Sequence, residues 1–185
     1  MSEKYKVVDS SKPTFITLTL VGWVDVLIRR KYINLLDESL AYCIQNKGLK
    51  VHAYVYMTSH IHLIVTSDKD EIQDIVRDFK KHTSKKLIEL IGESGESRKE
   101  WMLNKFAFEA KRVNRASNYK VWKDGFHPVI LDDNKKLMQR LNYIHYNPVD
   151  AGFVDHERDW LNSSYRGYEE GYNLKLYNFE LFPLY

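Results

Sequence analysis

The hydrophobic and polar positions of the chain follow two periods, and the strands stand out first. Residues 14–21 are rich in β-branched side chains and follow Pro13, which cannot continue a strand ladder. Residues 50–58 and 60–66 alternate with period two, which is typical of strands. The two alternating segments are so close in the chain that we expect a β-hairpin.

Three other segments carry apolar residues at helical spacing. They are residues 31–47, which end before Gly48, residues 71–92, and a segment from Asp132 or Asp133 to about Tyr146, where Asn147-Pro148 stops the helix. Between the last two, the polar residues 93–100 predict a surface loop and the best place for a mobile joint. A further strand is expected within residues 120–131, around the turn signal Asp124-Gly125.

The order of these elements predicts an α+β fold. Strand, helix, strand, strand, helix, strand and a following helix is the order of a ferredoxin-like or RRM-like antiparallel sheet, with helices on one face and the other face open. We expect residues 1–13 to form an N-terminal arm, residues 14–150 to form this domain, and residues 151–185 to form an aromatic tail that packs on it.

Composition narrows the class of protein. The 185 residues are 44% hydrophobic with a net charge of +3, so affinity for a polyanion must come from local patches. Cys43 is the only cysteine, which excludes an intrachain disulfide framework and a cysteine-based zinc site. We find neither an uninterrupted apolar span of membrane length nor a hydrophobic segment of signal-peptide type at the start. We therefore expect a cytoplasmic protein with no membrane association.

The stretch SHIHLIV, residues 59–65, places two histidines on a predicted strand. Residues two apart on a strand point the same way, so His60 and His62 would share the open face while Ile61 and Leu63 face the helices. Two neutral imidazoles at this spacing can ligate one divalent cation and leave positions for an oxygen ligand, water and substrate. The alternative is that both are surface or turn histidines whose hydrogen bonds water satisfies.

The third helix adds a second group of candidates. Tyr143 and Asn147 are four residues apart, on one stripe, and Arg140 precedes them by one turn. A helix docked by its separate apolar stripe would present a phenol as nucleophile and an amide oxygen as third metal ligand. The alternative is that Tyr143 is a boundary aromatic and that Asn147 only ends the helix before Pro148.

Together these motifs resemble those of one known family. SHIHLIV, VWKDGFHPVIL, YIHYNPVDAGFV and DWLNSSYRGY look like segments of the REP-associated tyrosine transposases, within the single-tyrosine HUH transposases of insertion sequences. The resemblance runs from about Thr14 to Tyr168. One departure is Thr58-Ser59, where the family often has Pro-Asn, and it affects the turn rather than the ligands.

The resemblance implies an activity and a set of site residues. His60, His62 and Asn147 would hold Mg²⁺ or Mn²⁺, and Tyr143 would attack a phosphodiester of single-stranded or hairpin DNA. A covalent 5′-phosphotyrosine would form, and its bond energy would allow a later strand transfer. The protein would act as a monomer or homodimer. The fate of the phenol proton stays open. The metal could lower the pKa of the phenol, or His127 or His145 could accept the proton.

Basic and aromatic side chains are candidates for holding the DNA. The basic candidates are Lys80 and Lys81 on the second long helix, the cluster of Lys111, Arg112 and Arg115, and Arg140. The lysine and arginine groups can equally be solvated faces. Tyr54 and Tyr56, expected on the open face of the sheet, could stack bases or could pack under the third helix or the tail.

Two other functions compete with a transposase. A non-catalytic RRM-like domain would read single strands with sheet aromatics, but the strand motif of RRM modules is missing and Tyr143 would have no purpose. A replication or relaxation initiator would use the same chemistry, but such proteins usually carry further domains, for which we expect no room in 185 residues.

Overall fold

The computed structural model describes residues 7–93, 95–113 and 118–170, and its centre is a four-stranded antiparallel sheet with the strand order β2-β3-β1-β4. The strands are β1 (Thr14–Thr19), β2 (Leu49–Tyr56), β3 (His60–Ser67) and β4 (Val129–Ile130). The helices are α1 (Arg30–Lys47), α2 (Ile72–Glu93), α3 (Lys99–Arg112), α4 (Asn134–Asp150) and α5 (Tyr165–Glu170). The order of elements is that of a ferredoxin-like sheet, so the predicted α+β fold is confirmed.

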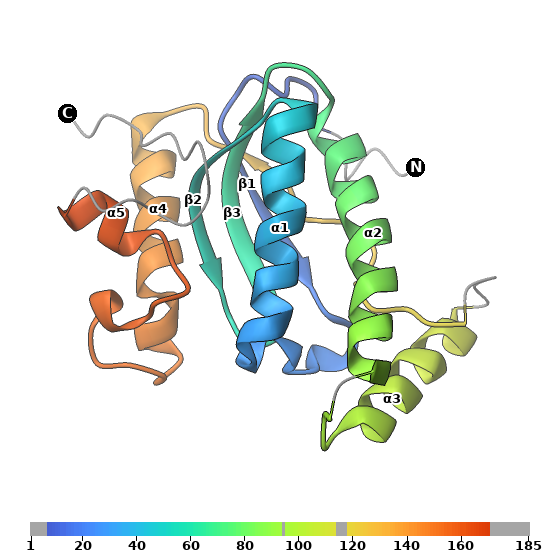
Figure 1. Ribbon diagram of the computed structural model, residues 1–185. Helices are drawn as coiled ribbons and strands as arrows, with labels where there is room; N and C mark the ends of the chain where they lie inside the picture. Colours follow the sequence, from blue (N-terminus) through green and yellow to red (C-terminus); the bar gives the residue numbers. More distant parts are fainter. Residues whose placement is uncertain (1–6, 94, 114–117, 171–185) are drawn as a thin grey trace.

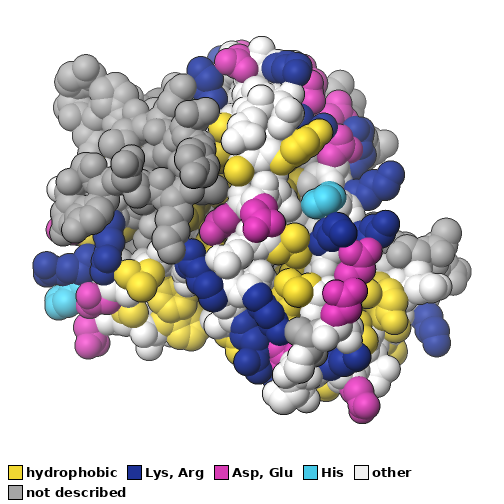
Figure 2. All heavy atoms as spheres, viewed as in Figure 1, with side chains coloured by type: hydrophobic (Ala, Val, Ile, Leu, Met, Phe, Trp, Pro, Cys, Tyr) yellow, Lys and Arg dark blue, Asp and Glu magenta, His cyan; other side chains and the backbone are white. Residues whose placement is uncertain are grey.

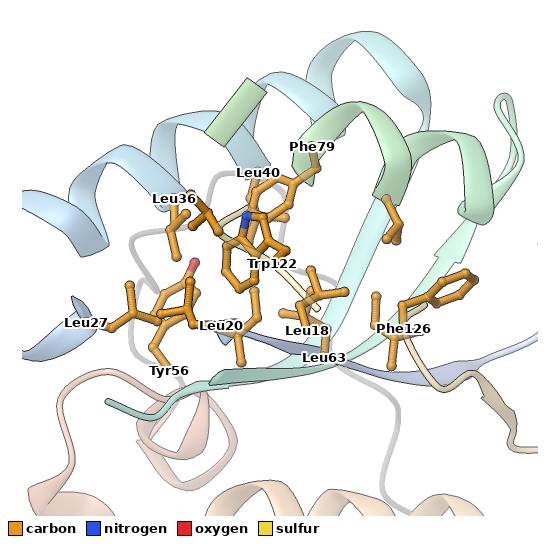
Figure 3. Close-up of a cluster of buried hydrophobic side chains, with 14 of the residues drawn as sticks. Leu18, Leu20, Leu27, Leu36, Leu40, Tyr56, Leu63, Phe79, Trp122 and Phe126 are labelled. Atoms are coloured by element: carbon orange, nitrogen blue, oxygen red, sulfur yellow. The ribbon is translucent and has the colours of Figure 1, made fainter. Parts of the chain in front are cut away.

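Helices lie on both faces of this sheet (Figure 1). On one face α1 and α2 cover the larger core, part of which Figure 3 shows: Leu18, Leu20, Leu36, Leu40, Leu63, Phe79 and Trp122. On the other face α4 packs Leu141 and Ile144 against Phe15, Val55 and Ile64. The apolar stripe of α4 therefore docks the helix on the face that carries the histidines, and that face is only partly open.

A β-bulge decides which β2 side chains face which layer. Between Val51 and Ala53 the pairing with β3 shifts by one residue, so His52 is an extra residue on β2. Tyr54 and Tyr56 consequently lie on the face of α1 and are buried there, and Figure 3 shows Tyr56 on the same side as the labelled leucines of α1. The prediction that these tyrosines lie on the open face is wrong, because alternation read across a bulge changes sides.

The C-terminal segment covers the outer edge of β2. Ser163 forms a bridge with Val55, and the N–H of Ser164 donates to the carbonyl of Tyr54 at 2.9 Å. An edge strand that is paired in this way does not offer its ladder to another chain. The described part of the expected tail thus lies against the sheet, whereas residues 171–185 lie outside the described part of the chain.

Helix α4 continues past the predicted stop at Asn147-Pro148, so that prediction is wrong. Pro148 lies inside the last turn, where its missing N–H removes one bond without ending the helix. The helix ends at Asp150, Gly152 follows in a left-handed conformation (φ 70°), and the N–H of Phe153 donates to the carbonyl of Pro148. This extra turn keeps Asn147 on the helix, one turn after Tyr143.

Residues 95–98 form a loop before α3, as predicted, but one of their side chains is buried. α3 begins at Lys99, and Glu96 in the loop before it is only 5% exposed. Its carboxylate pairs with Arg29 at 2.6 Å and with Arg98 at 3.5 Å, and it accepts from the Tyr32 hydroxyl at 3.2 Å. A buried carboxylate therefore ties this loop to the start of α1.

Within the described ranges, no helix combines the length and the apolar character that spanning a membrane requires.

Candidate active site

The site begins with the two histidines at the start of β3. The antiparallel pairing of β1 with β3 places His60 opposite Thr19 and His62 opposite Thr17. Both imidazoles share the face on which α4 packs, and their ring centroids are 4.8 Å apart at an interplanar angle of 75°. The predicted common direction of the two rings is therefore observed, and it follows from the two-residue period of the strand.

The two nitrogens of His62 have different environments. Nδ1 is hydrogen-bonded to the Thr17 hydroxyl at 2.8 Å. Nε2 is buried and has no hydrogen-bond partner among the residues that the structure describes. A buried polar atom without a partner is costly, and histidines that ligate a metal usually fix their second nitrogen by such a hydrogen bond. The pattern at His62 fits a metal ligand that binds through Nε2.

Both histidines are held in the neutral form at neutral pH. Burial, the neighbouring His60 and the positive charge of Arg140 lower the pKa of His62 to about 3. Burial and the ammonium group of Lys123 lower the pKa of His60 below its ordinary value. Neutral imidazoles have the free lone pair that metal coordination requires, so no proton has to be displaced near pH 7.

Tyr143 on α4 lies beside this pair. Its ring stands edge-on to the ring of His62, with 5.2 Å between centroids, and edge-on to Phe15 at 6.0 Å. The side chain is 42% exposed, so one side packs against the sheet and the other side is open to a substrate. The structure thus brings together the two parts of the site that the sequence placed on different elements.

Arg140 belongs to the same group of side chains. Its guanidinium carbon lies 4.9 Å from the centre of the Phe15 ring and 5.8 Å from that of Tyr143. Stacking on aromatic faces orients a guanidinium and leaves its N–H donors available for a phosphate. The residue predicted to hold DNA therefore lies next to the tyrosine.

Asn147 follows Tyr143 by one helical turn and is half-buried. In the described part of the chain, no cluster of three or more His, Cys, Asp or Glu residues could hold a metal ion. The amide oxygen of Asn147 is a group of another type that would complete a donor set with His60 and His62. Two imidazoles and an amide oxygen form a mixed donor set of the kind that Mn²⁺ accepts.

The two histidines considered as general base lie in different places. His145 is buried on α4, its Nε2 is hydrogen-bonded to the Ser164 hydroxyl at 2.9 Å, and its ring contacts Tyr165 and Tyr168. Residues two apart on a helix face different directions, so His145 is part of the packing of the C-terminal segment. His127 is exposed in the segment before β4.

The other basic candidates are dispersed. Lys80 donates to the carbonyls of Lys123 and Gly125 and so joins α2 to the segment before β4. Arg112 pairs with Glu109 at 2.9 Å, and Lys81 and Lys111 are exposed, whereas Arg115 lies outside the described residues. Figure 2 shows that lysines and arginines on the face of α1 and α2 are mixed with acidic side chains.

Sequence reasoning missed three neighbours of the histidine pair: Phe15, Thr17 and Trp23. Phe15 stacks on His62 with 5.3 Å between ring centroids, and Trp23 stands edge-on to His60 at 5.5 Å. Phe15 and Thr17 are two apart on β1, and this spacing is the signal that could have placed them on the histidine face. Their register against β3 is a pairing that a single sequence does not reveal.

Comparisons with known proteins agree with the fold of this chain. The model of the family described as "Transposase IS200 like" matches residues 25–147. This segment is more than half of the chain and includes all four residues predicted for the metal and the nucleophile. The chain belongs to the IS200-like transposase family, and the resemblance found in the sequence is confirmed.

Two individual proteins are similar to the chain. A REP-associated tyrosine transposase of Haemophilus influenzae is 40% identical over 45 residues, which are 24% of this chain and 26% of that protein. A solved structure of a REP-associated tyrosine transposase bound to a REP hairpin superposes with a TM-score of 0.65 at 18% identity, covering 100% of this chain and 95% of that one. At this identity the structural likeness shows the fold alone.

Proposed function

We propose that the protein is a DNA transposase that cleaves and rejoins single-stranded, hairpin-containing DNA through a covalent 5′-phosphotyrosine on Tyr143. In this proposal His60, His62 and Asn147 hold Mg²⁺ or Mn²⁺. Membership of the IS200-like family supports the class of activity, and the hairpin in the structural relative supports the class of DNA.

One observation carries the proposal: the buried Nε2 of His62 has no partner among the described residues, and the Tyr143 ring lies 5.2 Å from the same imidazole. A histidine kept only for packing would have both nitrogens satisfied or exposed. A divalent ion bound there would polarise a non-bridging phosphate oxygen and neutralise the charge that grows during the reaction.

The side chains of the protein have separate roles in this reaction. The Tyr143 oxygen attacks the phosphorus atom while the bond from phosphorus to the 3′ oxygen breaks, which leaves the 5′ phosphate on the tyrosine and releases a 3′-hydroxyl. Arg140 holds the phosphate beside the tyrosine through its N–H donors. Thr17 fixes the ring of His62 through Nδ1, which would leave Nε2 free to hold the ion. A later attack by a 3′-hydroxyl on the phosphotyrosine reverses the step and rejoins DNA.

A non-catalytic RRM-like domain explains the structure less well. Such a domain stacks bases on aromatic side chains of the open sheet face. Tyr54 and Tyr56 are buried on the opposite face, under α1. The aromatics that contact the histidine pair are Phe15, Tyr143 and Trp23, and they surround a candidate metal ligand rather than a bare sheet.

The experiment that tests the proposal is the capture of a covalent adduct. The protein is incubated with end-labelled single-stranded DNA that contains a hairpin, in the presence of Mn²⁺, and is then denatured and separated on a gel. The wild type should carry label through denaturation. Tyr143→Phe should carry none, because the ring remains but the attacking oxygen is lost.

The chain offers a matched control on the same helix. Tyr146 is three residues after Tyr143 and is 51% exposed, so Tyr146→Phe removes an equally accessible hydroxyl. This variant should form the adduct at the wild-type level. His60→Ala should lose both the adduct and the binding of Mn²⁺. An adduct in Tyr143→Phe, or its loss in Tyr146→Phe alone, would contradict the assignment of the nucleophile.

A further inference from the structure

A strained turn next to the histidine pair presents a tryptophan to solvent. Gly22 and Trp23 follow β1 and both have positive φ, 62° and 54°. A bulky residue is disfavoured in this region of backbone conformation, so the surrounding structure must hold it there. The N–H of Val21 donates to the carbonyl of Val121 at 2.9 Å, and that of Trp23 donates to Leu20 at 3.3 Å. The turn is thus fixed on both sides.

This backbone conformation leaves the Trp23 side chain 59% exposed. The indole contacts the site through His60: the two rings are edge-to-face, with 5.5 Å between their centroids and an interplanar angle of 83°. The ammonium group of Lys123 lies over the same indole, 4.3 Å from its centre. Lys123 is itself anchored, because its N–H donates to the carbonyl of Thr19 at 2.8 Å and its carbonyl accepts from Lys80 at 2.8 Å.

An exposed indole with a cation above it, beside a site for phosphodiester chemistry, matches the chemistry of a nucleotide. Unpaired bases stack on aromatic faces without strong sequence preference, and a neighbouring lysine pairs with the phosphate. Double-stranded DNA does not offer a free base face, whereas a single strand does. The position of the indole, against His60, places such a base close to the phosphate that Tyr143 would attack.

We infer that Trp23 and Lys123 form a binding site for one unpaired nucleotide that flanks the scissile phosphate. The base stacks on the Trp23 indole, and the Lys123 ammonium contacts the adjacent backbone phosphate. This inference rests on the proposed function for the position of the nucleotide, although stacking itself requires no cleavage. The site keeps the strand single and extended where it passes the histidines.

The test is a double-mutant cycle on binding rather than on cleavage. All proteins carry Tyr143→Phe and contain no added metal, and the probe is a fluorescein-labelled hairpin with a single-stranded arm of mixed sequence. Trp23→Ala should weaken binding, measured by fluorescence anisotropy, by about tenfold or more. Trp23→Phe should restore part of this loss, and Lys123→Gln should weaken binding and reduce its salt dependence.

A scan of abasic nucleotides along the arm identifies the stacked base. In the Trp23 protein one abasic position should weaken binding by the same factor as Trp23→Ala, and in the Trp23→Ala protein that position should have no further effect. Tyr42→Ala serves as control, because Tyr42 is an equally exposed aromatic (58%) on α1, on the opposite face of the sheet. Circular dichroism melting confirms that each variant is folded.

Two outcomes overturn the inference. One is unchanged binding in folded Trp23→Ala. The other is equal abasic effects at every position with and without Trp23, which would mean that no base of the arm stacks on the indole. The adduct assay of the wild type is read separately. An adduct without any Trp23 effect would leave the proposed function intact and remove only the nucleotide site.

Discussion

The ring of Tyr143 on α4 stands edge-on to the ring of His62 on β3 within one chain, with 5.2 Å between their centroids. The apolar contacts of Leu141 and Ile144 dock α4 on the same sheet face that carries the histidine. A candidate nucleophile and a candidate metal ligand of the same chain therefore lie side by side.

This relationship predicts that two inactive variants do not complement each other. His60→Ala lacks a metal ligand and Tyr143→Phe lacks the nucleophile, so an equimolar mixture should form no more adduct than either protein alone. The measurement is the gel assay after the two proteins are mixed, denatured together and refolded. A mixture of wild type and Tyr143→Phe provides the control and should give adduct in proportion to the wild type. Recovery of adduct in the first mixture would mean that the tyrosine serves the histidines of another subunit.

The parts of the fold that depend on local pattern could be predicted from the sequence. The period of β3 placed His60 and His62 on one face, and the helical spacing of α4 separated the docking stripe from Tyr143. Two of the errors lie where a non-local interaction overrides the pattern. Tyr54 changes face because of the bulge at His52, and Glu96 is buried because Arg29 reaches it from a distant segment.

Only the chemically distinctive residues of the candidate site could be predicted from the sequence. Histidine and tyrosine are recognisable by their chemistry, whereas Thr17 and Phe15 are ordinary strand residues whose importance comes from their register against β3. Trp23 gave no periodic signal, since it occupies a turn with positive φ. Residues of this kind can be assigned to the site only when the pairing of the strands in space is known.

Thr17 is predicted to control the affinity for the metal through His62. Thr17→Val keeps the shape of the side chain and removes the hydroxyl that lies 2.8 Å from Nδ1. Loss of such a hydrogen bond to a ligating histidine typically weakens metal binding about 10- to 100-fold. Isothermal titration calorimetry with MnCl₂ measures the change. Thr17→Ser keeps the hydroxyl and should bind nearly as the wild type does, and equal Mn²⁺ affinity in Thr17→Val would remove Thr17 from this role.

Glu96 is predicted to contribute to stability and not to chemistry. Glu96→Gln removes from a buried position the charge that pairs with Arg29 and Arg98. The free energy of unfolding in urea should fall by about 2 kcal/mol. Glu100→Gln, an exposed change at the start of α3, is the control and should have almost no effect. The adduct formed per folded molecule should be unchanged, and a selective loss of adduct in Glu96→Gln would place this carboxylate in the reaction instead.

His145 is predicted to make the stability depend on pH. Burial lowers its pKa from 6.5 to about 4, because a charge beneath Tyr168 would lose its hydration. The unfolded chain therefore takes up a proton near pH 6.5 and the folded chain only near pH 4, so the free energy of unfolding falls as the pH decreases through this window. The full effect of this one group is about 3 kcal/mol.

Urea unfolding at a series of pH values between these limits measures this loss. The comparison is with His145→Gln, which does not titrate and whose amide can still reach the Ser164 hydroxyl that His145 contacts at 2.9 Å. The wild type should lose more stability than the variant as the pH decreases, because only the wild type gains a proton on unfolding at this position. Since His60 and His62 are present in both proteins, their titration contributes equally and cancels in the difference. Parallel curves for the two proteins would show that His145 accepts its proton without disturbing the packing of the C-terminal segment.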